Sequence, residues 1–239
     1  MLSKLQDFAT QSSCYLLFML EISCSGLLFD LDGVLVDSTP AVARVWSKWA
    51  LAHGFDPGET VRKAHGRPSL ATIKELLPNA ADTIAENEVV LRAEIEDTEG
   101  VVPLPGVYEF LSAIPQDRWA LVTSCAKPLA HVRLAAAGIR IPEKMITSDD
   151  VLRGKPDPEP YLKGAALLGF PASECVVFED APAGIRAGKS AGARVLALPT
   201  TAVENELKAA GADWILPGYS HLTLAARNGS AGLKLLLNT

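Results

Sequence analysis

Residues 27–38, LLFDLDGVLVDS, join an apolar run to acidic side chains that follow it directly. Asp30 and Asp32 stand where a buried strand would end, and Asp37 follows shortly after. A buried carboxylate without a partner is costly, so folding alone gives no reason to place acids there. We therefore expect them to serve a chemical site at the end of the strand.

Two further apolar runs are followed by polar residues in the same way. Thr123 and Ser124 follow the run WALV, and Glu179 and Asp180 follow the run CVVF. In open α/β sheets a ligand lies outside the carboxyl ends of the strands. Helix capping would explain one such cluster, but three clusters at equivalent places indicate one shared site.

The predicted site collects four carboxylates, from Asp30, Asp32, Glu179 and Asp180. Carboxylates crowded together repel each other and raise one another's pKa. A hard divalent cation relieves this repulsion, and ligands that offer only oxygen favour Mg²⁺. The sequence has no His/Cys set with the spacing of a zinc site. We therefore predict Mg²⁺ as the cofactor.

Because Mg²⁺ is commonly shared with a substrate phosphate, the predicted chemistry is phosphoryl transfer. Asp30 is suited to attack phosphorus and form an aspartyl-phosphate, which divides one difficult step into two. Asp32, past the strand end, is suited to protonate the leaving oxygen and then to activate water. The segment RGKPDPEPY supplies a cation for the transferring group, Lys155, in a loop stiffened by Pro156 and Pro158.

Short apolar runs alternate with helix-like stretches from Gly26 onward. The runs are continuous, as is typical of parallel strands buried on both faces. Several helix-like stretches end in a glycine, a common C-terminal cap, at Gly138, Gly169, Gly192 and Gly211. Strands are predicted at 27–29, 119–123, 145–147, 175–178, 194–198 and 214–216. This pattern predicts an α/β fold with an open, mostly parallel, Rossmann-like sheet.

Residues 39–100 break the alternation and contain only helix-like stretches, at 39–54, 69–77 and 81–100. A helical block inserted after the first strand predicts a small second domain above the edge of the sheet. We expect an α/β core made of residues 26–38 and 101–239, and an α-helical cap made of residues 39–100.

Composition narrows the class of protein. The chain has 239 residues, of which 49% are hydrophobic, and a net charge of -6 from 22 basic and 28 acidic side chains. This mildly acidic balance argues against a nucleic-acid binder. The four cysteines show no CxxC spacing, which favours reduced thiols and a cytoplasmic protein. We expect a monomer with no membrane partner.

The N-terminal residues contain an apolar stretch, 14–22, CYLLFMLEI, that is too short to span a bilayer. A signal peptide would use Lys4 and the small residues SCSG, but Asp7 and Glu21 do not suit one. We expect residues 1–25 to form a loosely attached extension.

Four segments resemble, in order and spacing, the motifs of the haloacid dehalogenase-like (HAD) phosphohydrolases: DLDGVLVDS, VTS, GKPDP and VVFEDAPAGIRAG. The helical block matches the position of that family's α-helical cap. The resemblance covers Gly26 to about Tyr219, and no motif position departs from the pattern.

The resemblance implies a role for each motif residue. Asp30 would be the nucleophile and Asp32 the general acid/base. The metal would be held by the Asp30 side chain, the Asp32 backbone carbonyl and Asp180, with Glu179 beside these ligands or acting as a further one. A separate set would bind and neutralise the phosphoryl group: Thr123, the Ser124 backbone and Lys155.

Within the family, the chain looks most like the sugar-phosphatase branch. We therefore expect a Mg²⁺-dependent phosphatase acting on a small sugar or polyol phosphate. A phosphomutase of the same fold, like β-phosphoglucomutase, shares all four motifs and remains an alternative. A non-catalytic HAD-like binding module is disfavoured because it would not need Asp32, Lys155 and Asp180 together. A true dehalogenase is disfavoured because it has no use for the second aspartate.

Substrate contacts are expected from the turn AHGRPS in the helical block, which holds His65, Arg67 and Ser69. Closure of a cap must supply groups that hold the substrate and exclude water. Lys127, next to the second motif, is the candidate on the core side. The opposing interpretation is a polar connector with a solvated arginine.

Overall fold

A six-stranded parallel sheet forms the centre of the fold. The computed structural model describes residues 19–78, 82–225 and 232–238. The strand order is β6–β5–β2–β7–β8–β9, and every pairing in this sheet is parallel. The strands are β2 (Gly26–Phe29), β5 (Trp119–Val122), β6 (Met145–Ile146), β7 (Cys175–Glu179), β8 (Arg194–Ala197) and β9 (Trp214–Ile215). All six predicted strands are present, so the predicted fold class is confirmed.

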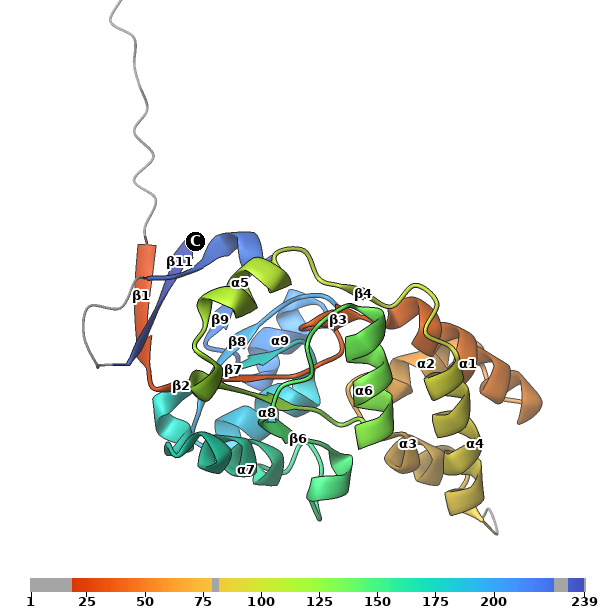
Figure 1. Cartoon of the computed structure of the whole chain (residues 1–239). Helices are drawn as coiled ribbons and strands as arrows, with labels where there is room; N and C mark the ends of the chain where they lie inside the picture. Colours follow the sequence, from red (N-terminus) through yellow and green to blue (C-terminus); the bar gives the residue numbers. More distant parts are fainter. Residues whose placement is uncertain (1–18, 79–81, 226–231, 239) are drawn as a thin grey trace, which may run out of the picture.

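Helices cover both faces of this sheet, which explains the continuous apolar strands. Leu27 and Phe29 of β2 pack in one hydrophobic cluster with α5 and α6, while Leu28 packs on the opposite face with α7, α8 and α9. The helices are α5 (Val107–Ala113), α6 (Lys127–Ala136), α7 (Glu159–Leu168), α8 (Pro182–Ser190) and α9 (Glu204–Ala210). Figure 1 shows these layers around the central strands.

The glycines predicted to cap helices adopt the backbone conformation that this role requires. Gly138, Gly169, Gly192 and Gly211 have φ of 67°, 79°, 84° and 100°. This left-handed region is strained for side chains other than glycine. The ends of four core helices were therefore predictable from the sequence.

Four consecutive helices follow β2 in the sequence and gather at one end of the molecule (Figure 1). They are α1 (Thr39–Ala52), α2 (Pro57–Ala64), α3 (Ser69–Leu76) and α4 (Thr83–Glu96), called the helical block below. A hydrophobic cluster of their own includes Trp46, Trp49, Ile73 and Val90. Two segments connect the helical block to the core, and they form a short antiparallel ribbon. It pairs β3 (Val36–Asp37) with β4 (Val102–Pro103).

Helix α2 was not predicted, although its start carries a clear signal. Asp56 is its N-cap and accepts a hydrogen bond from the Glu59 N–H at 2.7 Å. Pro57 occupies the first helical position, where its missing N–H costs nothing.

In the part of the chain that the structure describes, no helix is both long and apolar enough to cross a membrane.

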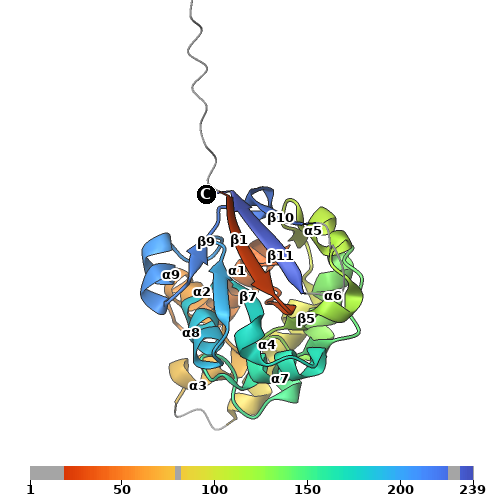
Figure 2. The same cartoon turned by 90° about the vertical axis from the view of Figure 1, so that its left-hand side faces the viewer.

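A second, antiparallel sheet joins the two ends of the described chain (Figure 2). Its order is β1 (Met19–Cys24), β11 (Leu233–Asn238) and β10 (Leu222–Leu224), with Ile22 opposite Leu235. Ile22 and Cys24 are buried in the core cluster with Leu235. The expectation of a loose extension is therefore wrong for residues 19–24, because β11 supplies a partner strand and the core an apolar surface. Residues 1–18 lie outside the described chain.

Candidate active site

The carboxyl ends of three adjacent strands, β5, β2 and β7, bring the predicted polar residues to one place. Asp30 follows β2 and donates its backbone N–H to Phe178 of β7 at 3.0 Å. Thr123 and Ser124 follow β5, and Glu179 and Asp180 stand at the end of β7. Since neighbouring parallel strands end at the same edge, these side chains converge as predicted from the sequence.

Lys155 forms ion pairs with two of these carboxylates, those of Asp30 and Glu179. Its Nζ lies 3.0 Å from Asp30 Oδ1 and 2.7 Å from Glu179 Oε1, and all three side chains are buried. Burial alone would lower the pKa of Lys155, but the two carboxylates outweigh it and hold that pKa above its usual value. Lys155 is therefore a permanent positive charge beside Asp30.

Each carboxylate oxygen of Glu179 accepts two hydrogen bonds. Its Oε1 accepts hydrogen bonds from Lys155 and from the Tyr161 hydroxyl, both at 2.7 Å. Its Oε2 accepts from the backbone N–H groups of Asp180 and Ala181 at 3.0 and 3.1 Å. A Cβ at Gly184 of α8 would lie 1.7 Å from Glu179 Oε1, so a glycine there makes room for the carboxylate. Glu179 thus orients Lys155 and the start of the loop after β7.

Asp30 and Asp180 are buried close to other carboxylates, and the pKa of each is raised. Burial raises the pKa of Asp30 to about 7, with the nearby carboxylates of Glu179 and Asp32 adding to the effect and Lys155 opposing it. Burial, with Glu179 and Asp30, also raises the pKa of Asp180 well above its usual value. Three buried acids around one lysine leave an excess of negative charge that favours a bound cation.

The donor set fits a hard cation such as Mg²⁺. Asp30, Glu179 and Asp180 each place a carboxylate oxygen within 4.8 Å of the others'. Asp180 Oδ1 is buried with no hydrogen-bond partner among the described residues, while Oδ2 accepts from Thr201. Oxygen-only ligands of this kind suit Mg²⁺. The free oxygen of Asp180 is placed as a metal ligand would be.

The Asp32 carboxylate is not part of this acidic group and meets a different set of partners. Its Oδ1 accepts from the Ser38 hydroxyl at 2.5 Å. Its Oδ2 accepts from Arg133 Nη1 at 2.6 Å and from the Cys125 thiol at 3.0 Å. The two aspartates, two residues apart in the sequence, therefore have separate environments, as a nucleophile and a proton-transfer group would need.

Gly33 allows the Asp32 loop to turn back against the β7 loop. Its φ is 71°, and a Cβ on it would lie 2.0 Å from Asp180 Oδ2. Any side chain would both strain the backbone and displace Asp180. The DxDG order in the sequence thus serves a close approach between the loops after β2 and β7.

Thr123 and Ser124 both line the space in front of Asp30. The Thr123 hydroxyl accepts from the Cys125 N–H at 3.1 Å, which shapes the turn after β5. Ser124 Oγ is buried with no hydrogen-bond partner among the described residues. A buried hydroxyl without a partner is unfavourable unless a ligand satisfies it, so this edge is suited to receive an anion.

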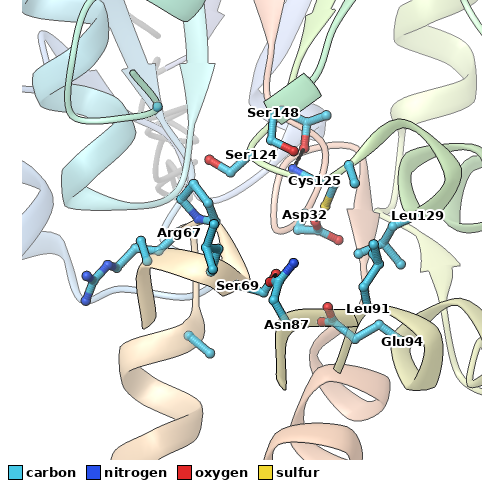
Figure 3. Close-up of a pocket in the computed structure, with 18 of the residues that line it drawn as sticks. Asp32, Arg67, Ser69, Asn87, Leu91, Glu94, Ser124, Cys125, Leu129 and Ser148 are labelled. Carbon is cyan, nitrogen blue, oxygen red and sulfur yellow. Dashed lines mark hydrogen bonds between the residues drawn. The ribbon is translucent and has the colours of Figure 1, made fainter. Parts of the chain in front are cut away.

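A cavity of about 520 Å³ separates the helical block from the carboxyl edge of the sheet. Its size is typical of a small-molecule site. Asp32, Ser124 and Cys125 line it from the core, while Ser69, Asn87 and Glu94 point into it from the helical block (Figure 3). The Ser69 hydroxyl donates to Asn87 Oδ1 at 2.6 Å. The cavity therefore has polar groups on both walls.

The residues predicted to bind substrate differ in their placement. His65 and Arg67 line the cavity, but the Arg67 guanidinium is directed away from Asp32 (Figure 3) and pairs with Glu75 at 2.8 Å. Lys127 is not among the lining residues, and its backbone N–H donates to Asp149. Asn87, Glu94 and Arg133 line the cavity and were not predicted, because charged and amide residues inside helical stretches read as solvent-facing.

Comparisons with known proteins agree with this site. Residues 24–192 match the family model of haloacid dehalogenase-like hydrolases. The chain is 45% identical over 179 residues to hexitol phosphatase A of Escherichia coli (strain K12), covering 73% of this chain and 83% of that protein. It is 34% identical over 220 residues to glycerol-1-phosphate phosphohydrolase 2 of Saccharomyces cerevisiae, covering 87% and 88%. A solved hydrolase structure from Pseudomonas syringae matches with a TM-score of 0.74 and 27% identity, covering 81% of this chain and 94% of that one.

Proposed function

The chain belongs to the haloacid dehalogenase-like hydrolases, and from this we propose that it is a Mg²⁺-dependent phosphatase of small sugar or polyol phosphates. The observation that carries the proposal is the separation of two aspartates at one cavity. Asp30 lies among buried acids and Lys155, while Asp32 lies apart on the cavity wall. The names of the two curated relatives, a hexitol phosphatase and a glycerol-1-phosphate phosphohydrolase, support this substrate class.

The two aspartates divide the chemistry between them. An oxygen of Asp30 attacks phosphorus, and the bond from phosphorus to the substrate oxygen breaks. Asp32 gives its proton to that oxygen, so the sugar or polyol leaves as a neutral alcohol. Asp32 then takes a proton from water as the water attacks the aspartyl-phosphate, which releases phosphate and restores Asp30. Thr123, Ser124 and Lys155 bind the phosphoryl group during both steps.

Mg²⁺ would be held by the carboxylates of Asp30 and Asp180 and by the backbone carbonyl of Asp32. When bound, it supplies positive charge that offsets the excess of buried carboxylates and the charge of the phosphoryl group. Because all contacts of the Glu179 carboxylate are to protein donors, we assign Glu179 to orienting Lys155 and the Asp180 loop. Its place as a further ligand is the alternative.

Removing the metal should abolish activity. We expect phosphate release to stop in EDTA and to return with added Mg²⁺. Asp180→Asn should weaken Mg²⁺ binding, measured by calorimetry on the metal-free protein, and lower the rate by at least about tenfold because one charged ligand is lost. Asp117→Asn, at an exposed side chain, is the matched control. Full activity in metal-free buffer would contradict the metal assignment.

The substrate should be recognised from the wall formed by the helical block. We expect Asn87→Ala to raise the KM for a hexitol phosphate by roughly tenfold, since a hydrogen bond to a substrate hydroxyl is lost. It should scarcely change the KM for p-nitrophenyl phosphate, which lacks those hydroxyls. His65 and Arg67, which also line the cavity, remain candidates, but the ion pair of Arg67 with Glu75 predicts a smaller effect for Arg67→Ala. A larger effect of Arg67→Ala than of Asn87→Ala would reverse this assignment.

One experiment separates the phosphatase from the phosphomutase alternative. The protein is incubated with Mg²⁺ and either a hexitol phosphate, glycerol 1-phosphate or β-glucose 1-phosphate. Free phosphate and glucose 6-phosphate are then measured. The proposal predicts phosphate from the polyol esters and little isomerised sugar phosphate. Glucose 6-phosphate as the main product would establish the mutase, and no turnover of any ester would favour a non-catalytic module.

The cytoplasmic location and the monomeric state expected from the sequence belong to this proposal as well. Cys24, Cys125 and Cys175 are free thiols in the described part of the chain. Burial raises the pKa of Cys24 to about 12 and that of Cys175 to about 11, which makes both thiols unreactive. Unpaired thiols support a reducing compartment.

A further inference from the structure

Arg133 is a buried arginine with no role in the scheme above. It lies on α6 and only 4% of it is exposed. Its Nη1 donates to Asp32 Oδ2 at 2.6 Å and to Cys125 Sγ at 3.1 Å, and its Nη2 donates to Glu94 Oε1 at 3.0 Å. Arginine is almost never buried so deeply unless it is paired. Here one guanidinium group forms ion pairs with two carboxylates, those of Asp32 and Glu94.

The two carboxylates come from different parts of the molecule. Asp32 belongs to the loop after β2 in the core, whereas Glu94 belongs to α4 of the helical block and is itself buried. Both project toward the cavity between these parts, beside Leu91 and Leu129 (Figure 3). The guanidinium group is planar and rigid, so a shift of Glu94 changes the direction in which Arg133 presents its other nitrogen to Asp32.

Stability alone does not call for this arrangement. Replacing a buried ion pair or triad by apolar residues of similar volume is often neutral or stabilising. The neighbouring wall of the cavity already contains leucines that would pack against such residues. The network also contacts Asp32, the proton-transfer group of the proposed reaction. Among the described residues, Arg133 makes no hydrogen bond to Asp30, Glu179 or Asp180.

We propose that Arg133 is a positioning residue that aims Asp32 at the substrate oxygen and links its position, through Glu94, to the seating of the helical block. Asp32 acts well only when it lies within hydrogen-bond reach of the leaving oxygen. The Arg133–Glu94 contact fixes one end of the guanidinium when the helical block is seated, so the acid is correctly placed in the state that encloses the substrate. This inference rests on the proposed function, in which Asp32 is the general acid.

The test compares substrates that do and do not need a general acid. kcat/KM reports substrate binding and the steps up to release of the alcohol, so it includes proton donation by Asp32 and excludes the later attack of water. We expect Arg133→Met to lower kcat/KM for a hexitol phosphate by roughly 10- to 100-fold, the scale of a misplaced catalytic group. For p-nitrophenyl phosphate, whose leaving group needs no proton, the loss should stay within about threefold. Glu94→Gln should show the same selectivity with a smaller loss.

Controls for these variants are available on exposed side chains of the same types. Arg140→Met and Glu88→Gln, the latter on α4 itself, should leave both substrates unaffected. Arg133→Lys should recover part of the loss, because a single ammonium can hold Asp32 but cannot span both carboxylates. If Arg133→Met does not fold, as judged by circular dichroism, Arg133→Lys and Glu94→Gln carry the test.

The decisive comparison places Arg133→Lys and Glu94→Gln in an Asp32→Asn background. A residue that acts through Asp32 should cost nothing further there, whereas a residue with a merely structural role should add its full loss. Additive losses, or equal losses on both substrates, would overturn the inference. Failure of the proposed function is recognised separately, because the Asp32→Asn single variant would then lack any selectivity between the two substrates.

Discussion

Asp30→Asn should abolish turnover of every phosphate ester, including p-nitrophenyl phosphate. An amide cannot attack phosphorus to give the acyl phosphate. The other carboxylate beside Lys155, that of Glu179, is not free to replace Asp30, because both of its oxygens accept hydrogen bonds from protein donors. We expect a loss on the order of 10⁵-fold or more, as when other covalent nucleophiles are removed. The measurement is phosphate release with both good and poor leaving groups.

This loss should come without unfolding. Burial raises the pKa of Asp30 to about 7, so its charged form is costly in the metal-free protein. A neutral amide of the same shape removes that cost, and the thermal midpoint of metal-free Asp30→Asn should equal or exceed that of the wild type at neutral pH. Asp117→Asn serves as the control on the surface. Residual activity within tenfold of the wild type would show that Asp30 is not the nucleophile.

Asp32→Asn should divide substrates by their leaving groups. For a polyol phosphate, kcat/KM should fall by roughly 10²- to 10⁴-fold, because the alkoxide must now leave without a proton. For p-nitrophenyl phosphate the loss in kcat/KM should be small. Metal binding should be retained, since the Asp32 carboxylate lies outside the group formed by Asp30, Glu179 and Asp180.

The aspartyl-phosphate should also persist longer in the Asp32 variant. Asp32 is the base that activates water, so its loss slows hydrolysis of the intermediate as well as its formation. A pre-steady-state burst with p-nitrophenyl phosphate, followed by slow turnover, is the expected signature. Equal losses on good and poor leaving groups, with no burst, would argue against Asp32 as the acid and base.

Much of the core was predictable because its signals are local. Continuous apolar runs mark strands buried on both faces, and glycines such as Gly138 and Gly169 mark the ends of helices. The convergence of Asp30, Thr123 and Asp180 follows from the rule that parallel strands end at one edge. The resemblance to haloacid dehalogenase-like hydrolases, found on the same residues, is confirmed by the family match.

The features that could not be predicted from the sequence depend on contacts between segments that are distant along the chain. Strand β1 forms because β11 pairs with it, and no local sequence pattern in residues 19–24 indicates that partner strand. In the same way, Arg133 and Glu94 sit in helical stretches where charges usually face solvent. They are buried here because α4 and α6 pack against each other across the cavity, and that packing is fixed by the seating of the helical block.

The role of Glu179 could not be predicted from the sequence alone. As a carboxylate next to Asp180, it looks in the sequence like an equivalent metal ligand. Its contacts with Lys155, Tyr161 and two backbone N–H groups instead occupy both oxygens. Sequence order placed Glu179 at the site, whereas its role follows from which donors the fold supplies.

The proposed reaction passes through a covalent phosphate intermediate on Asp30. The most direct measurement is a rapid acid quench of the Asp32→Asn protein with Mg²⁺ and a substrate labelled with ³²P, followed by peptide mapping. We expect label bound to the protein on the peptide that contains Asp30, formed before free phosphate and absent from the Asp30→Asn variant. Phosphate released without any protein-bound label, or label on a peptide that lacks Asp30, would contradict it.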